Sequence, residues 1–213
     1  MISNDQKQAL EVMKRQNNRL NSGIAYEKVM ELAQQNPYFN NALTMYHSSF
    51  FVSDHMVGFV LLVTALESLL SLSTYGKPEK CNECGQEKYK ITATVSDNVS
   101  ALLFDYDDKI QREIKKLYGK RSKFLHNGIK GITEDDTQIM QEYVRKVLLM
   151  YWCVAMGEAS DEHEVIMSVI QSPEYKNKYM YKNFLTSLDN TSFDEKRKKI
   201  LKDTIVHVFG VVQ

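Results

Sequence analysis

The chain contains few residues that interrupt helices. Three prolines and nine glycines occur in 213 residues, and these two residue types oppose helix propagation most strongly. No stretch alternates apolar and polar residues as a half-buried strand would. Long stretches rich in Leu, Met, Lys, Glu and Gln separate the few breakers. The sequence therefore predicts an all-α protein.

Cysteine, long apolar runs and net charge are also scarce. Three cysteines, an odd number, argue against a disulfide framework. The first residues lack the basic start and apolar core of a signal peptide, so we expect a cytoplasmic protein with reduced thiols. The most apolar run, residues 56–66, is shorter than the ~20 residues that cross a bilayer, so we expect no membrane partner. Basic and acidic residues number 27 each, and net charge therefore indicates no partner.

The basic residues are nonetheless clustered. From residue 109 to 130 Glu113 is the one acid, and the bases are Lys109, Arg112, Lys115, Lys116, Lys120, Arg121, Lys123 and Lys130. A second run comprises Lys196, Arg197, Lys198, Lys199 and Lys202. Clustered cations favour a localised polyanion site, although solvated helix faces produce the same pattern.

Apolar periodicity predicts helices over residues 5–20, 22–36, 39–51, 54–72, 91–104, 109–125, 133–155, 161–170 and 193–209. The helix at 54–72 is apolar on nearly all sides, and the helix at 133–155 carries a long series of apolar residues. Both are expected to be central. The first two are expected to be peripheral. We expect a break at Gly119, and a loose Lys- and Tyr-rich stretch before Leu188. The predicted organisation is an N-terminal helical extension (1–36), a helical core (37–158, with an insert at 74–90) and C-terminal helices packed on that core (159–213).

Glu67 is the exception on the apolar helix 54–72. A carboxylate is costly to bury unless it is paired. We therefore expect Glu67 to face a cation, water or a functional cleft. Exposure of the helix end is the alternative.

Two cysteines lie in the insert. Cys81 and Cys84, followed by Gly85, resemble one knuckle of a zinc ribbon, in which a turn directs two thiolates at one metal. One knuckle supplies two of four ligands, so the pair is either half of a structural zinc site or a turn without metal. Cys153 lies in a hydrophobic helix and is expected in the core.

The segment from Leu117 to Gly128 carries the clearest chemical signal. Arg121 is a permanent cation whose planar fork can hold a phosphate, and His126, five positions on, can move a proton near neutral pH. Together they suit attack on a phosphodiester. Five residues of ideal helix turn by about 140°, so the two side chains do not share a helix face. A chance spacing that includes a solvated arginine is the alternative.

The surrounding residues resemble the HEPN domain family, particularly its Apea-like branch. The apolar helix ending at residues 65–70, a variable insert, the segment 117–128 and another apolar helix match over about residues 50–157. The family signature is an Arg followed after four to six residues by a His, often with a polar residue directly after the Arg. Arg121, Ser122 and His126 fit this signature. Some relatives carry a modified Tyr two residues after the His; Gly128 stands here, so we do not expect that control.

The resemblance implies an up-and-down helical bundle that forms a homodimer, with two Arg/His pairs facing one composite cleft. It implies a metal-independent endoribonuclease of toxin or defence type, with RNA as substrate and an antitoxin or other regulatory protein as a further candidate partner. Arg121 and His126 are then the catalytic residues. The supporting residues are Ser122, Asn127, Glu67 and Tyr118, and the RNA-binding residues are Lys116, Lys120, Lys123 and Lys130. The alternatives are a non-catalytic RNA- or nucleotide-binding or dimerisation module, and a zinc-stabilised structural protein organised around Cys81 and Cys84.

Overall fold

The computed structural model describes residues 27–71, 91–103, 108–179, 184 and 188–209, with side chains to 206. These residues form helices and turns with no strand, which confirms the all-α prediction. The helix expected at 5–20 and the insert at 74–90 lie outside this part of the chain. Within it, no helix combines the length and the apolar character needed to cross a bilayer.

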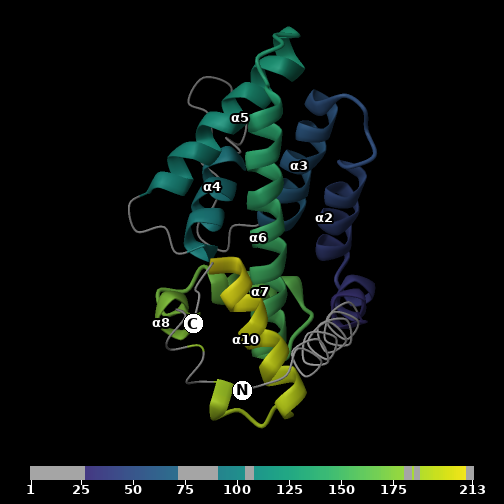
Figure 1. The fold of residues 1–213 in the computed structure, drawn as a ribbon. Helices are drawn as coiled ribbons and strands as arrows, with labels where there is room; N and C mark the ends of the chain where they lie inside the picture. The colour runs from purple at the N-terminus through teal and green to yellow at the C-terminus, as the bar shows by residue number, and fades with distance from the viewer. Residues whose placement is uncertain (1–26, 72–90, 104–107, 180–183, 185–187, 210–213) are drawn as a thin grey trace, which may run out of the picture.

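The described helices follow one another along the chain and pack side by side in a bundle (Figure 1). A helical segment at 27–35 leads into α2 (Pro37–Ser48), α3 (His55–Leu70), α4 (Ile91–Leu102), α5 (Lys109–Asn127) and α6 (Glu134–Glu158). Shorter elements follow, namely α7 (His163–Ile170), α8 (Tyr175–Tyr179) and α10 (Glu195–Phe209). The helices expected from periodicity in the described ranges are present, with ends shifted by a few residues.

Local side-chain chemistry sets several helix starts. Asn36 accepts a hydrogen bond from the Phe39 N–H at the start of α2, and Asp54 accepts one from Met56 at the start of α3. Thr133 and Asp136 form a reciprocal capping box at the start of α6. Asn, Asp and Thr are residue types that favour this first position of a helix.

Helices α3 and α6 form the centre of the bundle. Helix α3 packs mainly against α2 and α6, α4 packs against α5, and α10 packs against α6. The largest fully buried side chains include Trp152, Tyr151, Phe59, Leu62 and Leu66. Burying an apolar side chain of this size contributes about 1.5–3 kcal/mol. The two helices predicted to be central supply more of the described core than any other two helices.

Two segments differ from expectation. The helical segment at 27–35, expected at the periphery, buries Leu32 and Ala33 in the main core because its apolar residues recur at helical spacing. The stretch expected to be loose contains three buried, stacked aromatic rings, with centroids 5.1 Å apart for Tyr175–Tyr179 and 5.3 Å for Tyr179–Phe184. These aromatic side chains place the described part of the stretch against the core, where its lysines suggested a solvated segment.

Candidate active site at the end of helix α5

Helix α5 carries the Arg–His motif without interruption. Gly119 lies inside the helix, so the break expected there is wrong. A single glycine costs a helix only about 1 kcal/mol, and the packing of Ile114, Leu117 and Tyr118 in the core outweighs that cost. The helix ends at Gly128, whose positive φ of 66° suits glycine. Backbone bonds from Gly128 to Phe124 and from Ile129 to Lys123 close the last turn.

Arg121 points toward α3. Its Nη2 lies 3.4 Å from Oε2 of Glu67, and both side chains are largely buried, with exposed fractions of 26% and 22%. This contact confirms that Glu67 faces a cation. The Arg121 Nε atom is buried and has no hydrogen-bond partner within the described residues. That nitrogen is closed to solvent, so an external acceptor would have to meet the guanidinium through its exposed part.

Tyr118 is buried near Arg121 and Glu67 and interacts electrostatically with both. Burial raises the pKa of Tyr118 well above its ordinary value, the charge of Glu67 raises it further, and Arg121 opposes the shift. Its hydroxyl is buried without a hydrogen-bond partner in the described structure. Burial also raises the pKa of Glu67, against the influence of Arg121. Tyr118 is therefore a protonated donor, and Glu67 is a carboxyl that takes up a proton more readily than usual.

His126 lies in the last turn of α5 and is exposed, as are Ser122 and Asn127. Because α5 is continuous, His126 is rotated by about 140° from Arg121 around the helix axis. Arg121 faces α3, whereas His126 faces outward. One chain therefore brings together Arg121, Glu67 and Tyr118, and His126 has no hydrogen bond or ion pair with them within the described residues.

The four candidate RNA-binding lysines differ in their surroundings. Lys120 Nζ lies 2.6 Å from Oδ2 of Asp136, a carboxylate that also caps α6. Lys116, Lys123 and Lys130 are exposed and have no ion pair in the part of the chain that the structure describes. Three of the four cations are thus available to an external anion.

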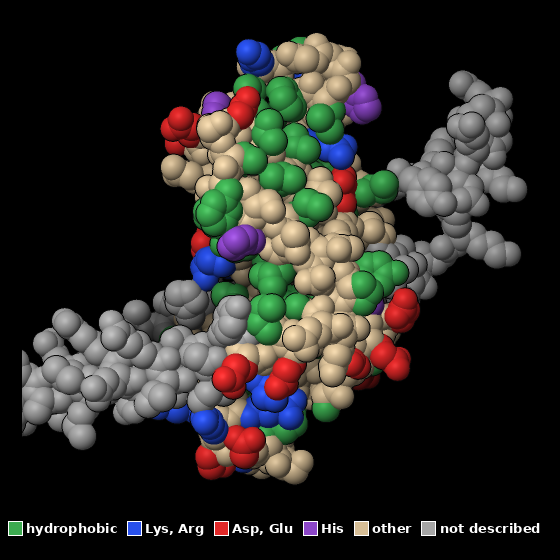
Figure 2. All heavy atoms as spheres, turned by 90° about the vertical axis from the view of Figure 1, so that its right-hand side faces the viewer, with side chains coloured by type: hydrophobic (Ala, Val, Ile, Leu, Met, Phe, Trp, Pro, Cys, Tyr) green, Lys and Arg blue, Asp and Glu red, His purple; other side chains and the backbone are tan. Residues whose placement is uncertain are grey.

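Apolar side chains are exposed at the same end of the bundle. The start of α3 adjoins the start of α6, since His55 contacts Ile132 O at 3.0 Å and Thr137 donates to His55 O. Near this end the exposed large apolar residues are Phe50, Phe51, Val57, Leu125 and Ile129. Figure 2, which faces α2 and α3, shows hydrophobic side chains gathered over the upper half of that face.

The expected metal ligands Cys81 and Cys84 lie outside the described residues. Within the described part, no group of three or more His, Cys, Asp or Glu side chains is arranged to hold a metal. Cys153 is buried, and burial raises the pKa of its thiol. That placement agrees with its expected core position.

A pocket lies between residues 27–35, the end of α6 and the start of α10. It was not predicted from the sequence. The basic run at 196–202 was a signal for it, but much of that run is paired inside the chain. Lys198 contacts Glu195 at 3.1 Å and Lys202 contacts Asp189 at 2.6 Å. Arg197 instead turns inward and donates to the backbone carbonyl of Met156.

Comparison of the chain with protein-family models, curated proteins and solved structures found no match.

Proposed function

We propose that the protein is a metal-independent endoribonuclease of HEPN type that acts as a homodimer, with Arg121 and His126 of two subunits around one RNA phosphodiester. The observation that carries this proposal is the arrangement on α5. It combines a partly buried Arg121 that is held by Glu67, an exposed His126 at the helix end, and exposed lysines beside them. A toxin or defence role, with a regulatory partner that restrains cleavage, belongs to the same proposal.

The rotation between Arg121 and His126 supports a shared site over a site within one subunit. A guanidinium facing α3 and an imidazole facing outward do not converge on one phosphate within one chain. Two copies related by a twofold axis can place the imidazole of one beside the guanidinium of the other. Phe50, Phe51, Val57, Leu125 and Ile129 provide apolar surface at this end for such a contact.

The proposed reaction uses the nucleophile that RNA itself carries. One His126 takes the proton of the 2′-hydroxyl, and the 2′-oxygen attacks phosphorus. Arg121 neutralises the charge on the equatorial oxygens of the phosphorane. The bond from phosphorus to the 5′-oxygen then breaks, and the second His126 protonates that oxygen. The products are a 2′,3′-cyclic phosphate and a free 5′-hydroxyl.

The decisive experiment incubates the purified full chain with RNA in the presence of a chelator and identifies the product ends. We expect Arg121→Ala and His126→Ala each to reduce cleavage by about 10²–10⁴-fold while the variants stay folded. Arg112→Ala, on the same helix, is the matched control and should cleave normally. Cleavage that survives both motif substitutions would remove the proposal.

Mixing the two inactive variants tests whether the site is shared. A heterodimer has one His126, from the Arg121→Ala subunit, and one Arg121, from the His126→Ala subunit. It keeps one of the two proton-transfer groups of the proposed reaction, so we expect activity above that of either variant alone but well below that of the unsubstituted protein. An Arg121→Ala/His126→Ala double variant mixed with either single variant should stay inactive. No recovery in a mixture shown to contain heterodimers would contradict the composite site.

A non-catalytic RNA-binding module is the second candidate. The ion pair that turns Arg121 toward Glu67 favours it, because a paired guanidinium in the interior serves as structural support. Salt-dependent RNA binding without any cleavage would favour this candidate.

A further inference from the structure

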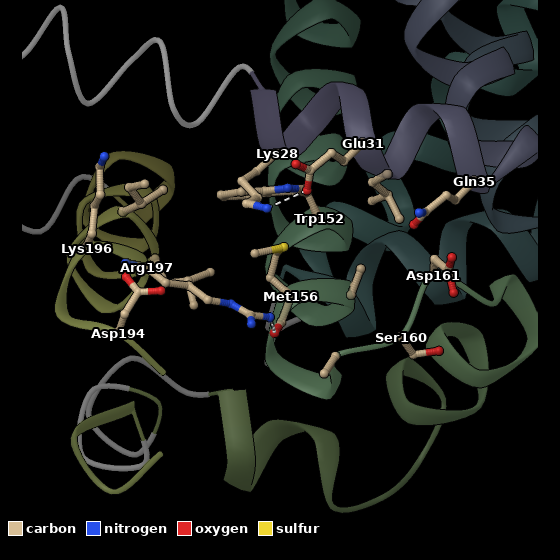
Figure 3. A pocket seen from close by; sticks show the side chains of 15 residues that line it. Lys28, Glu31, Gln35, Trp152, Met156, Ser160, Asp161, Asp194, Lys196 and Arg197 are labelled. Atoms are coloured by element: carbon tan, nitrogen blue, oxygen red, sulfur yellow. Dashed lines mark hydrogen bonds and ion pairs between the residues drawn. The ribbon is translucent and has the colours of Figure 1, made fainter. Parts of the chain in front are cut away.

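A buried polar cluster joins the start of α2 to the end of α6 and to α7. Asn36 caps α2, Tyr151 lies in α6 and His163 begins α7, and all three side chains are buried. Gln35, the neighbour of Asn36, lines the same pocket as Asp161 of the α6–α7 connection (Figure 3). The segment 27–35 therefore ends against that connection, and the cluster lies where the two meet.

Backbone partners fix which way the Asn36 amide points. Its Oδ1 accepts the N–H of Phe39 at 2.9 Å, so its Nδ2 is the donor to the Asp161 carbonyl at 2.8 Å. The same Nδ2 lies 3.1 Å from the hydroxyl oxygen of Tyr151. Because an amide nitrogen carries two hydrogens and accepts none, Tyr151 receives a hydrogen bond from Asn36.

The Tyr151 hydroxyl then donates its own hydrogen to His163. Burial raises the pKa of Tyr151, so the phenol keeps its proton. Nδ1 of His163 lies 2.8 Å from the hydroxyl oxygen, and with Tyr151 as the donor this nitrogen is the acceptor. His163 is therefore neutral, with its hydrogen on Nε2. The cluster forms one directed chain of hydrogen bonds that runs from Asn36 through Tyr151 to His163.

A proton on Nδ1 would reverse the last bond of this chain. An imidazolium has two donors and no acceptor. Tyr151 would then face donors on both sides, and its own hydrogen would lose its acceptor. An unmade hydrogen bond is costly in a buried site. Burial likewise lowers the pKa of His163, against the attraction of Glu164. Proton uptake therefore opposes the link between the start of α2 and α7.

The surroundings of His163 keep this effect modest. The titratable groups that face or adjoin it are Tyr38 of α2, Tyr151 of α6, the exposed Asp161 and Glu162 of the connection, and Glu164 of α7. The Tyr38 ring stacks on the imidazole with centroids 4.0 Å apart, and an aromatic face attracts a cation. Tyr38 and Glu164 thus favour the charged form, whereas burial and the Tyr151 bond favour the neutral form.

We propose that Asn36, Tyr151 and His163 are an acid-sensitive clamp that holds residues 27–36 and the start of α2 on the core. At neutral pH the directed chain is complete, and the apolar side chains of that segment stay in the core. Below about pH 6.5, proton uptake by His163 breaks the chain, and this part of the structure opens more often. The clamp is separate from the proposed nuclease centre and does not depend on it.

Hydrogen exchange of the full chain, measured by mass spectrometry and corrected for the intrinsic rate at each pH, reports this opening. In peptides that cover residues 27–39 we expect opening to rise about 2–5-fold from pH 7.0 to pH 5.5. The sign follows because the opened segment frees an imidazole that takes up a proton more readily than the buried one. At both pH values these peptides should open more often than those of α3.

Substitutions separate proton uptake from packing. His163→Asn places an amide oxygen near the position of Nδ1 and takes up no proton, so opening should no longer change with pH. Tyr151→Phe removes the partner that Asn36 and His163 share, and should raise opening at pH 7.0 about 2–10-fold. His47→Asn, at an exposed histidine of α2 outside the cluster, is the matched control and should keep the pH dependence of the unsubstituted protein.

The imidazole gives a second readout that does not depend on the folding of a variant. Nitrogen NMR of the full chain with labelled histidine should show His163 with its hydrogen on Nε2 at pH 7.0. A hydrogen on Nδ1 at that pH would overturn the proposal. So would equal opening of residues 27–39 at the two pH values, or a pH dependence that persists in a folded His163→Asn variant. Opening of residues 27–39 no more often than α3 would also overturn it, because the segment would then leave only when the whole protein unfolds.

Discussion

Two partly buried arginines occupy different parts of the bundle and differ in what meets their charge. Arg121 in α5 faces the carboxylate of Glu67. Arg197 in α10 faces a backbone carbonyl and an aromatic ring. Each keeps an unpartnered buried Nε within the described structure. The difference lies in the counter-charge: the chain supplies a carboxylate to Arg121, whereas it supplies a carbonyl dipole and an aromatic ring to Arg197.

The largest difference in the free energy of unfolding is expected when each arginine is replaced by methionine. Arg121→Met leaves the largely buried Glu67 carboxylate without its cation, and we expect a loss of about 2–3 kcal/mol in the free energy of unfolding. Arg197→Met leaves only a carbonyl unpaired and removes a poorly matched charge, so the loss should stay below about 1 kcal/mol. Urea denaturation of both variants measures the difference. Equal losses would show that the two environments are energetically alike.

Two helical glycines offer the next test. A Cβ at Gly157 in α6 would lie 2.7 Å from the hydroxyl of Tyr179, a rigid buried residue that donates to Glu158 at 2.6 Å. A Cβ at Gly119 in α5 would meet nothing within 4 Å. Gly157→Ala should therefore destabilise the protein by about 1–2 kcal/mol.

Gly119→Ala should instead stabilise it by about 0.5–1 kcal/mol, because alanine favours the helix interior. Thermal and urea denaturation of the two variants measure whether each substitution raises or lowers the free energy of unfolding. Destabilisation by Gly119→Ala would contradict a continuous α5.

Asp136 tests the link between the motif helix and α6. Burial would raise the pKa of Asp136, but hydrogen bonds from Lys120 and Thr133 prevail and hold it below its usual value of 3.8. A lowered carboxyl pKa contributes stability that is present above pH 3.8 and is lost as the pH falls through the folded-state pKa. Asp136→Ala should cost about 1 kcal/mol at neutral pH through loss of the capping box. It should also reduce the loss of stability on acidification. Asp135→Ala, at the exposed neighbouring position, should change neither the stability at neutral pH nor its loss on acidification.

The smallest expected effect concerns His163. Its Nδ1 lies 2.8 Å from the hydroxyl of buried Tyr151, and burial lowers its pKa below 6.5 while Glu164 opposes the shift. The unfolded chain therefore takes up the proton first, and stability falls as the pH drops below 6.5. We expect a loss of less than about 1 kcal/mol between pH 7 and pH 5.5. Glu164→Gln should enlarge that loss, and an unchanged or smaller loss would contradict the assigned cause.

Much of the local structure was predictable from residue patterns. Apolar periodicity located α3, α5 and α6, and side chains within three residues of each helix start supplied the caps at Asp54 and Thr133. The expected break at Gly119 was wrong because a single glycine weakens a helix less than core packing strengthens it. The candidate pair Arg121 and His126 was visible as a spacing, but the direction of each side chain was not.

The amino-acid sequence by itself determined the approximate positions of the described helices and which of them are apolar enough to be central, since helical hydrogen bonds and caps join residues a few positions apart. Only the tertiary structure decided that Arg121 meets Glu67, 54 positions away, and that Arg197 meets Met156, 41 positions away. Such pairs depend on how helices cross and how their side chains interdigitate. That geometry follows from the packing of the whole core, so no local pattern carries it.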